Sequence, residues 1–187
     1  MTYIEVWNEA RMNPSFYYTV HEPSTIVNDL NEFIQTNRNL AHWTPLAFEE
    51  PHWDAALNVP DEVLDQDPFL VALRAKAPFS GGILRMAPWT TYDWHQDYQR
   101  GCSLNLLLTD PDRSCCLFRH SPSEQIHQMY PIVPVPYTNT HYICLNTQIE
   151  HSVFNWDKDR FIFTLHFEKE LDEFTYKDLL KIVLSKR

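Results

Sequence analysis

The sequence is short of glycine and of positive charge. Its 187 residues include 3 glycines, and 15 Lys and Arg stand against 25 Asp and Glu, a formal net charge of −10. With so few glycines, the turns must depend on Pro, Asp and Asn. Lys and Arg supply most of the affinity for a phosphate backbone, and the basic residues form no run beyond the tail "LSKR". We therefore expect no nucleic-acid partner.

Long apolar runs and paired cysteines are absent as well. No run has the length that a membrane span needs, and the opening "MTYIEVWNEARMNPS" lacks the basic-then-apolar order of a signal peptide. No C-x-x-C pair occurs, which argues against a zinc knuckle, so reduced, buried thiols are expected at Cys102, Cys115, Cys116 and Cys144. These features predict a cytoplasmic protein, and the length suits one domain with a sizeable core.

The first part of the chain, residues 1–80, mixes helical and strand patterns. The stretch "FYYTV" at 16–20 reads as a short strand. Residues 24–39 predict a helix that begins with Ser24 as N-cap and places one apolar face against the core, made of Ile26, Leu30, Phe33 and Ile34. We expect this part to pack on the barrel that follows.

The rest of the first part divides into a loop and a second helix. Residues 44–60 contain prolines without a clean period and are predicted to be loop. Asp67 is the expected N-cap of the next helix, with Pro68 at its first position and Pro78 ending it. Its core-facing residues would be Phe69, Leu70 and Leu73.

From residue 81 to residue 168 the pattern changes to short strands. About seven segments rich in β-branched and aromatic residues are separated by Pro, Asp and Asn, which indicates an antiparallel sandwich or a jelly-roll barrel. Residues 169–187 return to a helical pattern, with Leu179, Ile182 and Val183 as its apolar face. The predicted fold class is mainly β with flanking helices around a jelly-roll, cupin-like core.

An H-x-D pair, His95 and Asp97, directly precedes one of the predicted strands. Side chains two apart on a strand point to the same face, so both could bind one metal ion. His151, next to a later strand, offers a third ligand. Two histidines and one carboxylate form the triad that suits non-haem Fe(II) oxygenases.

H-x-D alone is a weak signal, because the sequence contains a second copy at His52 and Asp54. That copy lies in the predicted loop, and we interpret it as a surface or packing pair. Two later features favour His95: His151 is available, and Arg160 opens the strand that follows it. The guanidinium fork of an arginine can bind a carboxylate through two hydrogen bonds.

In this order the residues resemble the iron- and 2-oxoglutarate-dependent dioxygenases, which share a double-stranded β-helix fold. The blocks "GGILRMAPWTTYDWHQDYQRGCSLNLLLTD" and "CLNTQIEHSVFNWDKDRFIFTLHF" are similar, more narrowly, to the aspartyl/asparaginyl β-hydroxylase group. They depart from that group at Trp89, where it has a turn glycine. They depart again at Ser103 and Asn105, where it has Arg and His, which leaves a prolyl-hydroxylase-like assignment within the same superfamily open.

The resemblance implies an oxygenase that hydroxylates a C–H bond of a peptidyl or free amino-acid side chain and releases succinate and CO2. Fe(II) would be held by His95, Asp97 and His151, and O2 and 2-oxoglutarate would bind there. Arg160 would pair with the far carboxylate of 2-oxoglutarate, with Asn105, Ser103 and Thr164 as further co-substrate contacts. Candidate substrate contacts are Arg85, Trp94, Tyr98 and Arg100.

Two alternatives stay open on the sequence. A cupin-like metalloprotein would keep the three metal ligands without using 2-oxoglutarate, and Arg160 would then be dispensable. A non-catalytic β-sandwich interaction protein would use His95 and His151 as packing residues and bind no metal. For the oxygenase, the expected partner is a peptide or small-molecule substrate.

Overall fold

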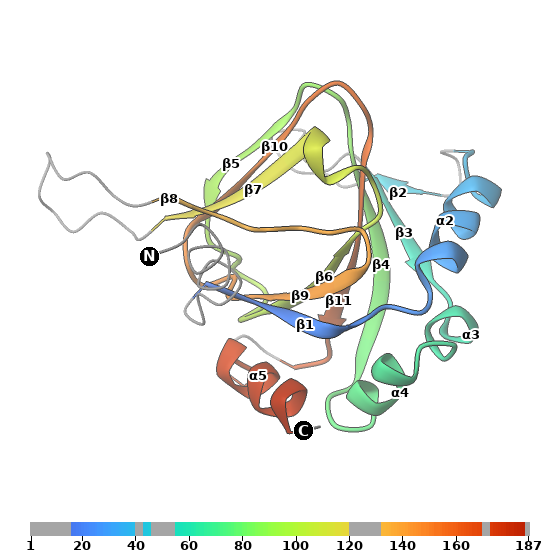
Figure 1. The fold of residues 1–187 in the computed structure, drawn as a ribbon, viewed down its shortest axis with the longest axis vertical. Helices are drawn as coiled ribbons and strands as arrows, with labels where there is room; N and C mark the ends of the chain where they lie inside the picture. Colours follow the sequence, from blue (N-terminus) through green and yellow to red (C-terminus); the bar gives the residue numbers. More distant parts are fainter. Residues whose placement is uncertain (1–15, 40–42, 46–54, 120–131, 170–172, 186–187) are drawn as a thin grey trace, which may run out of the picture.

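A computed structural model describes residues 16–39, 43–45, 55–119, 132–169 and 173–185. Two antiparallel sheets form a barrel of the jelly-roll type (Figure 1). The predicted fold class, mainly β with a jelly-roll core, is confirmed. The second H-x-D copy at His52 and Asp54, and two further histidines, His120 and His127, lie outside the described residues.

The larger sheet has seven strands in the order β1-β9-β6-β11-β4-β3-β2. Their bounds are Tyr17–Pro23 for β1, His141–Leu145 for β9, Ser103–Leu107 for β6, Arg160–Phe167 for β11, Phe79–Met86 for β4, Ala55–Val59 for β3 and Thr44–Pro45 for β2. The long strands β4 and β11 pair in unbroken register from Arg160↔Met86 to Phe167↔Phe79 and form the centre of the sheet.

The smaller sheet has four strands in the order β5-β10-β7-β8. Their bounds are Thr91–His95 for β5, His151–Asn155 for β10, Ser114–Arg119 for β7 and Ile132–Pro134 for β8, with a 3-10 turn at Pro111–Arg113 before β7. This sheet covers one face of the larger sheet, and helices lie along the other side (Figure 1).

The helices are α2 (Val27–Thr36), α3 (Asp61–Leu64), α4 (Pro68–Arg74) and α5 (Tyr176–Leu184). They bury their apolar residues in a core on the outer face of the larger sheet, and a second core of residues such as Ile162 and Val153 lies between the sheets. Strand alternation divides neighbouring residues between the two: Phe163 belongs to the outer core and Ile162 to the inner one.

The sequence patterns predicted most of these helices and strands, but the start of one helix and the loop at 44–60 were predicted wrongly. The Asp67 carboxylate caps α4 through the Phe69 N–H, as expected. Ser24 does not cap α2, because the N-cap is Ile26, two residues later. The stretch 44–60 is not all loop: β3 occupies Ala55–Val59, whose buried alternate residues form a strand pattern too short to stand out beside the prolines.

All four cysteines are free thiols, and Cys102, Cys116 and Cys144 are buried, as expected, whereas Cys115 is half-buried. Burial raises the pKa of the Cys102 and Cys116 thiols to about 12, so these groups are protonated and unreactive. In the described part of the chain, no helix is long and apolar enough to span a membrane.

Candidate metal centre

His95, Asp97 and His151 meet where two strands of the smaller sheet lie side by side. His95 is the last residue of β5, His151 is the first of β10, and the two are Cα partners in the ladder. Asp97 lies just beyond β5, so the alternation of a strand does not place it. Instead its backbone N–H donates to the Thr147 carbonyl at 3.0 Å, which turns the loop back over the ladder.

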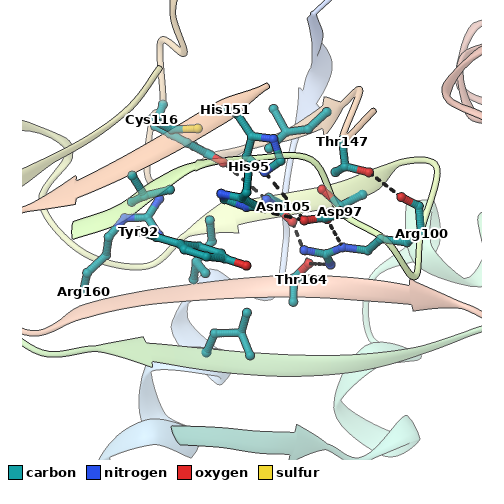
Figure 2. A pocket seen from close by; sticks show the side chains of 16 residues that line it. Tyr92, His95, Asp97, Arg100, Asn105, Cys116, Thr147, His151, Arg160 and Thr164 are labelled. Carbon is teal, nitrogen blue, oxygen red and sulfur yellow. Dashed lines mark hydrogen bonds and ion pairs between the residues drawn. The ribbon is translucent and has the colours of Figure 1, made fainter. Parts of the chain in front are cut away.

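The three side chains direct their ligand atoms at one point. His95 Nε2 lies 3.5 Å and His151 Nε2 lies 3.8 Å from Asp97 Oδ1, and one ligand atom from each residue lies within 4.8 Å of the other two. The imidazole rings are 4.2 Å apart between centroids. Figure 2 shows the group at one end of a cavity between the sheets.

Both imidazoles are oriented by backbone carbonyls. His95 Nδ1 lies 2.6 Å from the Asp93 carbonyl, and His151 Nδ1 lies 3.0 Å from the Ile149 carbonyl. A carbonyl only accepts hydrogen bonds, so each Nδ1 carries a proton, and in a neutral ring Nε2 then holds the lone pair. This is the usual arrangement of metal-ligating histidines, in which the other ring nitrogen donates to a fixed acceptor.

The donor set fits a cation. His95 Nε2 is buried and makes no hydrogen bond with any described residue, although a buried polar atom normally has a partner. Burial, followed by the neighbouring His95, lowers the pKa of His151 to about 4, so this imidazole is neutral near pH 7. A bound metal ion would take up both nitrogen lone pairs and the Asp97 charge.

Arg100 holds the second oxygen of Asp97. Burial raises the pKa of Asp97, but His95, Arg100 and His151 together hold it well below its usual range. The Arg100 Nε–H donates to Asp97 Oδ2 at 2.6 Å, and its terminal nitrogen donates to Thr164 Oγ1 at 3.1 Å. The carboxylate is therefore ionised, with Oδ1 left facing the two imidazoles. Sequence reasoning did not identify this pairing.

Arg160 lies at the other end of the same cavity. It is 1% exposed, its Nε–H donates to Ser114 Oγ at 3.0 Å, and its guanidinium carbon lies 5.5 Å from the Tyr137 ring centroid. A buried guanidinium is stable only when it is hydrogen-bonded or paired. The cavity thus has three metal-type ligands at one end and a fixed cation at the other (Figure 2).

A row of neutral polar groups connects the two ends. Thr164 Oγ1 donates to Asn105 Oδ1 at 2.7 Å, and Asn105 Nδ2 donates to the Tyr137 hydroxyl at 3.3 Å. Ser103 also lines the cavity, and its buried hydroxyl makes no hydrogen bond with a described residue. Ser103, Asn105 and Thr164, the three residues named beside Arg160 as further co-substrate contacts, therefore all border the cavity.

The four candidate substrate contacts differ in where they lie relative to the cavity. Tyr98 and Arg100 line a groove beside the cavity. Trp94 lines neither the cavity nor this groove. The Arg119 guanidinium carbon lies over it, 4.3 Å from the centroid of its ring. Arg85 does not reach the site either: it alternates with Leu84, which lines the cavity, and pairs with Asp159 at 2.9 Å.

Comparison with known proteins gives matches in structure only. No family model and no curated protein matches the chain. A prolyl-4-hydroxylase of Pseudomonas putida superposes with a TM-score of 0.54 at 16% identity, over 82% of this chain and 91% of that one. A 2OG-Fe(II) oxygenase-family oxidoreductase of Burkholderia pseudomallei gives 0.53 at 14%, over 91% and 93%.

The non-haem alpha ketoglutarate-dependent epimerase SnoN of nogalamycin biosynthesis gives a TM-score of 0.56 at 15% identity, over 87% of this chain and 82% of that one. At these identities the likeness shows a shared jelly-roll fold. The narrower resemblance to the aspartyl/asparaginyl β-hydroxylase group stays a prediction.

Proposed function

We propose that the protein is an Fe(II)- and 2-oxoglutarate-dependent oxygenase. The observation that carries this proposal is one cavity with a His95-Asp97-His151 donor set at one end and the buried Arg160 guanidinium at the other. Two histidines and a carboxylate leave three positions open on an octahedral metal, the pattern of non-haem Fe(II) oxygenases. The shared fold supports the same class.

Each residue then has a definite task. His95, Asp97 and His151 hold Fe(II), and Arg100 keeps the Asp97 carboxylate ionised and presents one oxygen to the metal. Arg160 binds the far carboxylate of 2-oxoglutarate through its fork. Asn105 and Ser103, with their amide and hydroxyl groups inside the cavity, are available to the near carboxylate. Bound Fe(II) supplies the redox chemistry by which O2 and 2-oxoglutarate oxidise the substrate and yield succinate and CO2.

The finer assignment is hydroxylation of an amino-acid side chain, free or within a peptide. It rests on the two sequence blocks that resemble the aspartyl/asparaginyl β-hydroxylase group. In that reaction one oxygen atom of O2 enters the substrate C–H bond as a hydroxyl, and the other enters succinate. A cytoplasmic location stays a prediction from the sequence.

Formation of succinate tests the class. Purified protein with Fe(II), 2-oxoglutarate and O2 should release succinate and CO2 slowly without substrate, because co-substrate and metal bind in the same cavity. The measurement is succinate by mass spectrometry, with Fe(II) or O2 omitted as controls. Tight Fe(II) binding without any succinate would favour the cupin-like alternative, and no metal binding would favour the non-catalytic one.

A further inference from the structure

A second hollow, which we call the outer groove, opens beside the cavity of the metal centre. It has a volume of about 420 Å³, within the range of small-ligand sites. The two hollows share a wall, so a molecule in the outer groove would lie against Asp97, one of the three metal-ligand residues. The residues common to both are Leu84, Tyr92, Asp97, Arg100 and Thr164.

The floor of the outer groove contains Gly82 of β4, between Asn58 of β3 and Thr164 of β11 in the sheet register. The fold does not require glycine here. No described glycine has a positive φ, and a Cβ at Gly82 would meet only the Leu57 carbonyl oxygen, at an ordinary 3.7 Å. Gly82 therefore leaves open the space that a side chain would fill.

The neighbouring Gly81 serves a different purpose. A Cβ on Gly81 would lie 2.9 Å from side-chain atoms of both Leu64 and Phe163, which belong to the helix-covered core. Since successive residues of a strand face opposite sides, a side chain at position 82 would project into the outer groove. The missing side chain at Gly82 thus shapes the groove, whereas that at Gly81 shapes the core.

Among the residues that the structure describes, the outer groove offers no unpaired carboxylate, ammonium or guanidinium group, although the chain carries a net charge of −10. Its charged residues are Asp97 and Arg100, which pair with each other at 2.6 Å. The remaining polar lining consists of hydroxyl, amide and imidazole groups, and Tyr98 is 77% exposed at its edge. Besides the tyrosines, the other polar residues of the lining are Asn58, Ser80, Gln96, Gln99, Thr164 and His166.

We propose that the outer groove binds the organic substrate, and that this substrate is uncharged. It presents hydroxyl or amide groups to Asn58 and Gln99 and an apolar face to the ring of Tyr98. Amides and hydroxyls both donate and accept hydrogen bonds, whereas a charged ligand would lose its hydration without gaining a counter-charge. This inference rests on the proposed oxygenase class; of the finer assignment it keeps a neutral side chain within a peptide and excludes a free, zwitterionic amino acid. A short neutral peptide and a polyhydroxylated small molecule share the required chemistry.

Ligand-observed NMR with defined probes tests the proposal without depending on turnover. The probes are N-acetylated, C-amidated tripeptides with neutral, acidic or basic side chains, together with neutral methyl glycosides, at pH 8, above the ordinary titration range of imidazole. We expect neutral probes to bind. Whether the neutral peptide or the glycoside binds then shows which of the two kinds of substrate the outer groove accepts. The Gly82→Leu variant should bind the same probe at least about tenfold more weakly, and Gly82→Ala should lie between.

Melting temperatures of both variants should be no lower than that of the unsubstituted protein, because a Cβ at position 82 meets no close neighbour and glycine within a strand lowers stability. Three results would overturn the proposal: no neutral probe binds, a charged probe binds more tightly than its neutral counterpart, or Gly82→Leu binds as well as the unsubstituted protein. If the oxygenase proposal were wrong and the groove proposal right, succinate would be absent, whereas probe binding and its dependence on position 82 would persist.

Discussion

A His151→Ala variant will lose Fe(II) binding and with it all succinate formation. His151 supplies one of the two imidazole nitrogens that face Asp97 Oδ1, at 3.8 Å, and no other described His, Cys, Asp or Glu joins the cluster to replace it. Removing a residue that only supports a metal ligand typically lowers affinity 10- to 100-fold. Loss of the ligand itself should exceed that range, so we expect affinity to fall by more than about 100-fold. Anaerobic calorimetric titration with Fe(II) measures the change.

His141→Ala is the matched control for that experiment. His141 opens β9, its Nδ1 lies near the Thr138 and Thr140 hydroxyls, and it borders neither hollow. Its removal should leave Fe(II) affinity unchanged. If His151→Ala bound Fe(II) as tightly as the His141→Ala control, the three residues would not be the metal site.

An Arg160→Ala variant will keep its metal and lose 2-oxoglutarate. Arg160 is buried at the far end of the cavity, and truncating one partner of a buried, hydrogen-bonded charge pair costs about 2–5 kcal/mol. Since about 1.4 kcal/mol is a factor of ten, the dissociation constant of 2-oxoglutarate should rise by roughly 30-fold or more. Arg160→Lys should recover part of this, because it keeps the charge but not the fork. Titration of 2-oxoglutarate into the Fe(II)-loaded protein gives the constants.

Arg85→Ala is the control arginine. It lies on β4, the strand paired with β11, but it forms an ion pair with Asp159 outside the cavity, so 2-oxoglutarate affinity should not change. An Arg160→Ala protein that bound 2-oxoglutarate normally would show that the co-substrate assignment is wrong, and the cupin-like alternative would then account better for the metal site.

The strand pattern predicted the fold class because alternation and turn residues are local signals. The Asp67-Pro68 start of α4 and the strands from β6 to β11 followed from neighbouring residues alone. Strand β5 was not predicted: Tyr92 and Trp94 alternate with polar residues, but a pattern of five residues is too short to stand out, and none of the five is buried. Strand β3 was hidden within a proline-rich stretch for a similar reason.

The proximity of His95, Asp97 and His151 was predicted from their order along the chain, but the details of the site depend on tertiary structure. The sequence analysis named Arg85 as a substrate contact, but Arg85 shares its strand face with Ile83. Only the position of the helices shows that this face packs against the outer core rather than the cavity. The bond from Arg100 to Asp97 and the role of Gly82 depend on how separate strands meet, which no local pattern reveals.

The visible absorption spectrum of the anaerobic protein tests the central claim most directly. When 2-oxoglutarate chelates Fe(II) held by His95, Asp97 and His151, a metal-to-ligand charge-transfer band should appear that neither Fe(II) nor 2-oxoglutarate gives alone. The band should be absent in His151→Ala and require more 2-oxoglutarate in Arg160→Ala. A protein that binds Fe(II) and saturating 2-oxoglutarate yet shows no such band would contradict the account.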